Sequence, residues 1–269
     1  MKSQNDKELV LTLVLFVEFI LMYSVKDKFW IIFFLMLFTV FYGIKRIIEI
    51  KGFGEHIKNW HLFTFPILYL TGTIFFLSLL RNLIFQIITI AVFTLSSKFL
   101  FSALRKLAAK KEKPLLVSKN FISMIGLLII FLLLTDITNA VIFWELPVYL
   151  LMILVFFAVM AVSYFLYWQY RDVDRNSLIF ISLISFVIAE ISWASSFWMV
   201  TYPSFEIGSL GVPVFVLVSL IIYYCFWGIA HHKLEESLTK KVLLEYAMIS
   251  AIIIVIILLT SDWMPKGLT

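Results

Sequence analysis

The feature that most constrains this chain is a series of apolar runs, each close to the roughly 20 residues that a helix needs to cross a bilayer. Hydrophobic residues make up 62% of the chain and charged residues 14%, whereas soluble domains are about half apolar and about a quarter charged. A chain of 269 residues cannot bury this much apolar surface in a core of its own. Lipid must therefore cover much of it.

We predict an all-α fold, a polytopic transmembrane helix bundle of about nine spans. It is expected to be a single integral membrane domain over residues 1–269, because the segments between the runs leave no room for a soluble domain. The predicted spans are 8–25, 29–46, 62–80, 82–104, 120–141, 147–169, 177–200, 209–231 and 242–261.

Lysine and arginine are distributed unevenly between the two sides of this predicted bundle. One side holds 17 of the 22 basic residues, Lys98 lies within a span, and the other side holds Lys26, Lys28, Arg81 and Lys266. Positive residues stay in the cytoplasm, so the N-terminus is predicted inside and the C-terminus outside the cell membrane. The polar start, MKSQNDKE, is followed by no cleavage site, so the first helix is expected to remain as an anchor.

Acidic side chains inside the predicted spans are the first candidates for a functional site. Glu18 and Glu190 lie roughly 10–15 Å from the outer boundary, at 1.5 Å of rise per residue, and Asp136 lies at similar depth or shallower. Intramembrane acids mark proton or solute sites. We expect one polar pocket in the outer half of the bundle, or, alternatively, separate acids that only fix helix packing. The other expected lining residues are Arg81, Thr135, Thr138, Asn139 and Trp193.

Small residues follow one face of the seventh predicted span at helical spacing. Such stripes let helix backbones approach closely and are typical of helix–helix interfaces in membranes. Glu190 is next to this stripe in sequence, so its side chain is expected to point into protein and not into lipid. The stripe consists of Ser182, Ser185, Ala189, Ser192 and Ser196.

The histidines are all predicted on the cytoplasmic side. His231–Glu235 and His232–Glu236 are i,i+4 pairs, a spacing that can bind metal on a helix, but no third ligand is identified. The pairs are typical of a solvated helix extension. Neither a phosphate-binding G-x-x-x-x-G-K-[ST] loop nor an H-E-x-x-H motif occurs, and no histidine is available inside a span for haem. No catalytic residue, cofactor or metal ligand is predicted.

A basic segment follows the fourth predicted span. Clusters of this kind beside a membrane attract anionic lipid. Membrane lipids are therefore the expected partners, with a protein partner or a second copy of the chain as further alternatives, and nucleic acid is not expected. The residues predicted to contact anionic lipid are Arg105, Lys106, Lys110, Lys111 and Lys113.

Three stretches of the C-terminal third carry a resemblance: AEISWASSFWMVTYPSF, YYCFWGIAHHKLEESLTKKVLLEYAMIS and LLTSDW. With its acid and Trp, its paired His and its terminal Trp, this part resembles an uncharacterised family of multi-pass membrane proteins, known only as a domain of unknown function, from reduced-genome candidate-phyla bacteria. The resemblance implies a prokaryotic inner membrane. It implies no activity and assigns no functional residue.

Three classes of function remain open. Low glycine and proline content favours a non-catalytic bundle, a subunit or scaffold that binds lipid or a partner protein, because transporters usually contain broken helices. The alternative is a proton- or solute-coupled secondary transporter that uses the outer-half acidic pocket. The second alternative is a lipid-modifying membrane enzyme, with Asp136 and Glu145 as acids near headgroup level.

Overall fold

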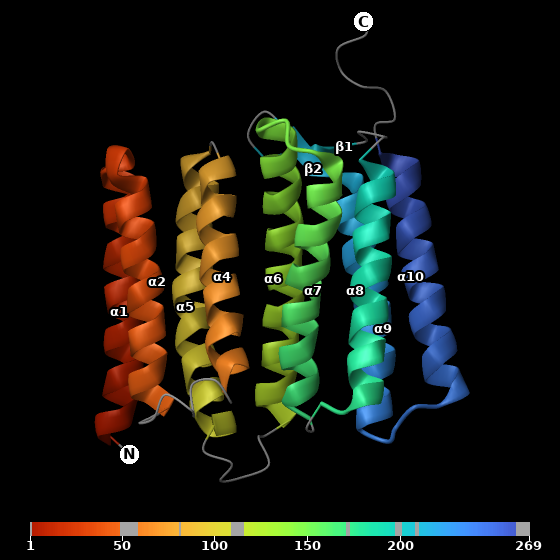
Figure 1. Ribbon diagram of the computed structural model, residues 1–269, viewed down its shortest axis with the longest axis horizontal. Helices are drawn as coiled ribbons and strands as arrows, with labels where there is room; N and C mark the ends of the chain where they lie inside the picture. The colour runs from red at the N-terminus through yellow and green to blue at the C-terminus, as the bar shows by residue number, and fades with distance from the viewer. Residues whose placement is uncertain are drawn as a thin grey trace, which may run out of the picture. The chain divides into compact units, whose positions relative to one another are not determined.

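The computed structural model describes residues 2–48, 59–80, 82–108, 116–170, 173–196, 201–207 and 210–261 (Figure 1). Over these ranges the chain forms nine long α-helices, one short 3-10 helix and one β-hairpin. Eight of the nine described helices, all except the first, are long and apolar enough to cross a membrane. The predicted all-α polytopic bundle is confirmed, and the protein is a multi-pass membrane protein.

Contacts between the helices divide the chain into two compact units, Met1–Ile125 and Gly126–Thr269. The boundary falls inside one continuous helix, α6 (Leu116–Phe143), at Gly126. The prediction of one integral membrane domain made no such division and stays a prediction.

The first unit is built on four helices that contact one another. It contains α1 (Lys2–Ser24), the 3-10 helix η1 (Lys26–Lys28), α2 (Phe29–Ile48), α4 (Trp60–Leu79) and α5 (Leu83–Ala108). Helix α1 packs against α2 and α5, and α4 packs against the same two helices. Because α1 shares this packing but is not among the eight candidate spans, the ninth span stays a prediction.

Aromatic rings fill the centre of this unit. Phe93 of α5 lies 4.9 Å, between ring centroids, from both Phe19 of α1 and Tyr69 of α4. The Tyr69 hydroxyl is 2.7 Å from the Ser96 hydroxyl, so its polar end is satisfied inside the bundle. Apolar side chains on the outer faces, such as Phe34 and Ile84, are exposed, as lipid contact requires.

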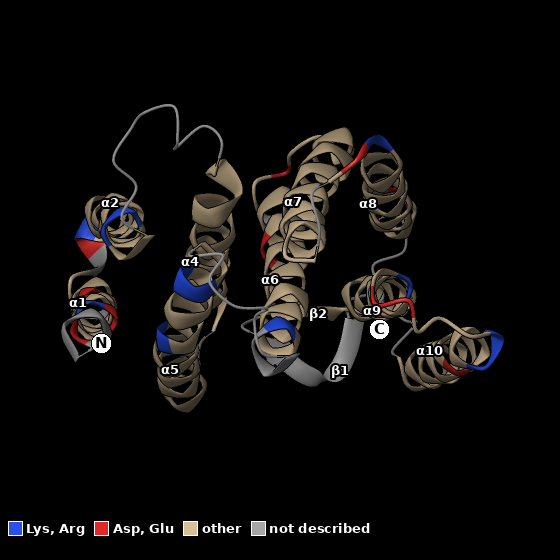
Figure 2. Cartoon of the chain, turned by 90° about the horizontal axis from the view of Figure 1, so that it is seen from below, with Lys and Arg blue, Asp and Glu red and all other residues tan. Residues whose placement is uncertain are grey.

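The second unit contains the rest of α6 and four further helices, α7 (Val148–Trp168), α8 (Arg175–Ser195), α9 (Val214–Leu234) and α10 (Lys240–Thr260). Helix α8 packs on α7 and α9, and α10 packs on α9. Seen end on, α9 lies between α8 and α10 (Figure 2). A hydrogen bond of 3.0 Å joins the buried hydroxyls of Ser163 in α7 and Tyr223 in α9.

A β-hairpin precedes α9, where the sequence predicted the start of a span at residue 209. Strands β1 (Thr201–Ile207) and β2 (Leu210–Pro213) pair antiparallel, with a register irregularity between Tyr202 and Glu206. Pro213 is the N-cap of α9, where its fixed φ suits a helix start and its missing N–H is not needed. Residues 210–213, which hydropathy alone assigns to the helix, therefore belong to the hairpin.

Candidate functional site

Helix α6 carries a buried acid among the predicted site residues, Asp136. Asp136 lies seven residues before the last residue of α6, Phe143, which is roughly 10 Å along the helix axis. Its exposed fraction is 8%, and its neighbours Leu132, Leu133 and Leu134 are buried as well. Neither carboxyl oxygen of Asp136 has a hydrogen-bond partner within the described residues.

Three polar side chains surround Asp136 in sequence, and each bonds to its own helix. The hydroxyl of Thr138 donates to the carbonyl of Leu134 at 2.6 Å, and the Asn139 amide donates to the carbonyl of Thr135 at 2.7 Å. Thr135 donates to the carbonyl of Phe131. Because these three side chains donate to backbone carbonyls of α6, none of them donates a hydrogen bond to the Asp136 carboxyl.

Glu18 belongs to the other unit and has a different environment. It is buried in α1, and its Oε1 accepts a hydrogen bond of 2.7 Å from the Thr39 hydroxyl of α2. Its Oε2 has no partner within the described chain. The Glu18–Thr39 hydrogen bond thus joins α1 to α2, which is the packing role that the sequence left open as an alternative.

Glu190 differs from the expectation that it points into protein, because its side chain is exposed. Ser185, Ala189 and Ser192 are buried on the side of α8 that packs on α7 and α9. One residue further along a helix is a rotation of about 100°, so adjacency to Ala189 in sequence turns Glu190 away from that side. No hydrogen bond or electrostatic interaction joins Glu190 to Asp136 in the described chain.

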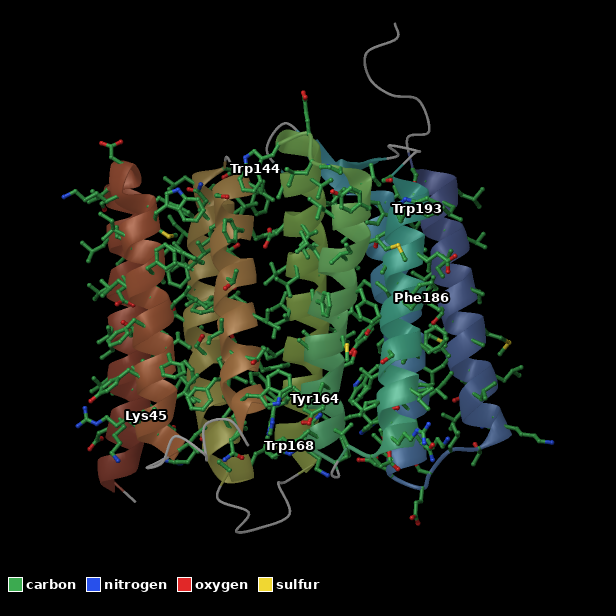
Figure 3. The ribbon with its side chains drawn as sticks, viewed as in Figure 1. Lys45, Trp144, Tyr164, Trp168, Phe186 and Trp193 are labelled. Carbon is green, nitrogen blue, oxygen red and sulfur yellow. The ribbon has the colours of Figure 1, made fainter. Side chains whose placement is uncertain are left out.

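The other members of the small-residue stripe lie at its margins. Ser182 and Ser196 are half-buried, at either end of the three buried residues. Ser185 and Ser192 donate to the carbonyls of Ile181 and Ile188, which keeps their hydroxyls satisfied while the backbones approach. Trp193, labelled in Figure 3, is 41% exposed, and Glu190 one turn before it is exposed as well.

The basic residues predicted at the site or at lipid are described in part. Arg81, Lys110, Lys111 and Lys113 lie outside the described residues. Lys106 is exposed, as lipid contact requires. Arg105 has an internal partner, because its Nη1 lies 2.9 Å from the Glu8 carboxyl oxygen Oε1.

His56 lies outside the described residues, and the other three histidines are less solvated than the sequence suggested. The pair of His231 and Glu235 is confirmed at 3.2 Å, and the His231 ring lies 5.2 Å from the Tyr170 ring. His232 hydrogen-bonds through Nδ1 with the Ser237 hydroxyl at 2.8 Å. His61 is buried at the start of α4 instead of lying in a loop. Within the described ranges, no three His, Cys, Asp or Glu side chains gather as metal ligands.

The ion pair of Glu8 with Arg105 was missed by the sequence reasoning. A signal for it exists, because both residues are predicted at the cytoplasmic level, one at the start of the first span and one just after the fourth. Opposite charges at one membrane level attract strongly where water is scarce. Which two helices are neighbours is not visible from hydropathy, so the partner could not be chosen.

Comparison with known proteins gives no match to this chain among protein-family models, curated proteins or solved structures. What the fold defines is a class, that of multi-pass membrane proteins with apolar helices. The resemblance carried by the C-terminal third stays a prediction.

Proposed function

We propose that this multi-pass membrane protein binds a proton at Asp136 and uses it in proton-coupled transport of a solute. The observation that supports the proposal is the burial of a carboxyl group with no hydrogen-bond partner for either oxygen in the described chain. An ionised, unpaired carboxylate at this depth costs at least about 2.5 kcal/mol. A proton removes that cost, and its release is favourable only when water or a counter-charge reaches the site.

The sequence context of Asp136 suits such a switch. Asn139 follows Asp136 by three residues, a spacing that places the two side chains on one face of the helix, and its amide donates to the Thr135 carbonyl. An amide that turns away from that carbonyl can donate to an ionised Asp136 instead. A change of hydration at one side of the bundle would then change the occupancy of the carboxyl.

A second candidate is a non-catalytic bundle that binds lipid or a partner protein. The observation that favours it is close, unbroken packing: the described helices are continuous, and a Cβ added at Gly126 of α6 would lie 2.8 Å from the Leu166 Cδ1 atom of α7. Tightly packed continuous helices are unlike the broken helices common in secondary transporters. In this alternative Asp136 keeps its proton permanently.

We also propose a prokaryotic inner-membrane location, with the N-terminus in the cytoplasm and the C-terminus outside. The uneven distribution of lysine and arginine supports this orientation. The resemblance of the C-terminal third supports the choice of membrane.

Infrared spectra of the reconstituted protein, recorded while the external pH is stepped, test the role of Asp136. We expect a carboxylic-acid C=O band that weakens reversibly as pH rises and is missing from Asp136→Asn. The control is Glu245→Gln, since Glu245 is exposed and lies 3.9 Å from the Lys241 ammonium. A pH-dependent difference spectrum that is the same in Asp136→Asn as in the wild type contradicts the proposal, and an Asp136 band that does not respond to pH favours the non-catalytic bundle.

A further inference from the structure

Exposed side chains form a stripe on α8 that is separate from its packed side. Leu183, Phe186, Glu190 and Trp193 recur at steps of three, four and three residues, and all four are exposed. That spacing keeps them on one helix face. Figure 3 labels Phe186 and Trp193, which both project from α8, with Trp193 closer to the β-hairpin end of the helix.

Glu190 is the charged member of this apolar stripe. Within the described chain it makes no hydrogen bond and no ion pair, whereas Glu245, an exposed acid on α10, lies 3.9 Å from the Lys241 ammonium. An exposed carboxylate on a membrane-spanning helix needs either a counter-charge or water. The described residues around α8 provide no counter-charge for Glu190.

The depth of Glu190 identifies where a counter-charge would come from. Glu190 lies five residues before the end of α8 at Ser195, which is roughly 8 Å at 1.5 Å of rise per residue. Trp193 lies about one turn nearer that end, and tryptophan prefers the headgroup level of a bilayer. Glu190 is therefore just below the headgroups, within reach of a cation that descends from them.

We propose that Glu190 and Trp193 form a binding site for a phospholipid with an ammonium headgroup. The Glu190 carboxylate pairs with the ammonium by charge and hydrogen bonds, since an ammonium has donors and no acceptor. The Trp193 indole, which is 41% exposed, attracts the same cation through its ring electrons. Phe186 and Leu183, deeper on the stripe, offer apolar contact to the acyl chain of that lipid.

Native mass spectrometry of the delipidated full-length protein tests the proposal with phosphatidylethanolamine and phosphatidylglycerol of identical acyl chains. An exposed ion pair together with a cation–ring contact is worth about a five-fold preference for the ammonium lipid. We expect Glu190→Gln to abolish that preference and Trp193→Leu to reduce it. Glu190→Asp, which keeps the charge, should retain part of it.

The control variant is Glu245→Gln, which removes a paired exposed acid from α10 and should leave the lipid preference unchanged. Because Glu190 is exposed, its substitution by Gln should also leave the unfolding midpoint unchanged. A Glu190→Gln protein that binds both lipids as the wild type does overturns the proposal. So does a Glu190→Gln protein whose only change is conversion of a dimer to a monomer, which would assign this face to a second copy.

Discussion

At the scale of single residues, Glu8 and Arg105 form a partly buried ion pair in the described part of the first unit. Glu8 is 5% exposed at its side chain and Arg105 is 21% exposed, and their charged atoms are 2.9 Å apart. Lys98 and Lys106 add positive charge around the same carboxylate. The pair joins the start of α1 to the last turn of α5, so it fixes α1 to the bundle at the end opposite to the Glu18–Thr39 hydrogen bond.

Removing both members of this pair should therefore destabilise the protein by less than the two single removals added together. We expect Glu8→Gln and Arg105→Gln each to lower the free energy of unfolding by about 2 kcal/mol, because each leaves a charge without its partner. The double variant should lose less than the sum of the two, which a double-mutant cycle on unfolding in detergent measures. Strict additivity would show that the two side chains do not interact in solution. Arg46→Gln, which removes an exposed basic residue in the last turn of α2, is the control.

At the scale of helices, the position of each element was easier to predict than the face it presents. Apolar runs located the described helices within a few residues, because apolar length follows directly from bilayer thickness. The predicted orientation of Glu190 on α8 was wrong, because hydropathy shows that a residue lies in a span but not which helices lie beside that span. Asp136 was predicted as a buried acid, and the structure adds that neither of its carboxyl oxygens has a hydrogen-bond partner within the described residues.

The α9–α10 contact offers a test of helix packing. A Cβ added at Gly228 of α9 would lie 2.1 Å from the Tyr246 ring carbon Cε1 of α10, closer than any real contact. We expect Gly228→Ala to lower the free energy of unfolding by about 1–3 kcal/mol. Tyr246→Ala in the same protein should recover part of that loss by making room for the methyl group. The matched control is Gly126→Ala, where the facing atoms are the ends of a flexible leucine, so the loss should be smaller; an equal loss in both variants would contradict the packing account.

At the scale of the whole molecule, α1 decides how many times the chain crosses the membrane. Eight described helices are long and apolar enough to span it, and α1 shares the packing of its unit through α2 and α5. If those eight cross and α1 also spans, the described helices make an odd number of crossings, and the two ends of the described chain lie on opposite sides. If it does not, the number is even and the ends lie on one side. The asymmetry of lysine and arginine fits the odd number.

Single cysteines in the turns between helices test this count, in a background where Cys225 is replaced by Ser. Asp27 lies in the turn after α1 and Ser237 in the turn between α9 and α10, and both are exposed. We expect an impermeant maleimide applied to intact cells to label Asp27→Cys and not Ser237→Cys. An N-terminal tag should be protected in the same cells, because α1 separates it from Asp27. Labelling of the tag and of Asp27→Cys from the same side would show that α1 does not cross the membrane, and the predicted opposition of the two chain ends would fail with it.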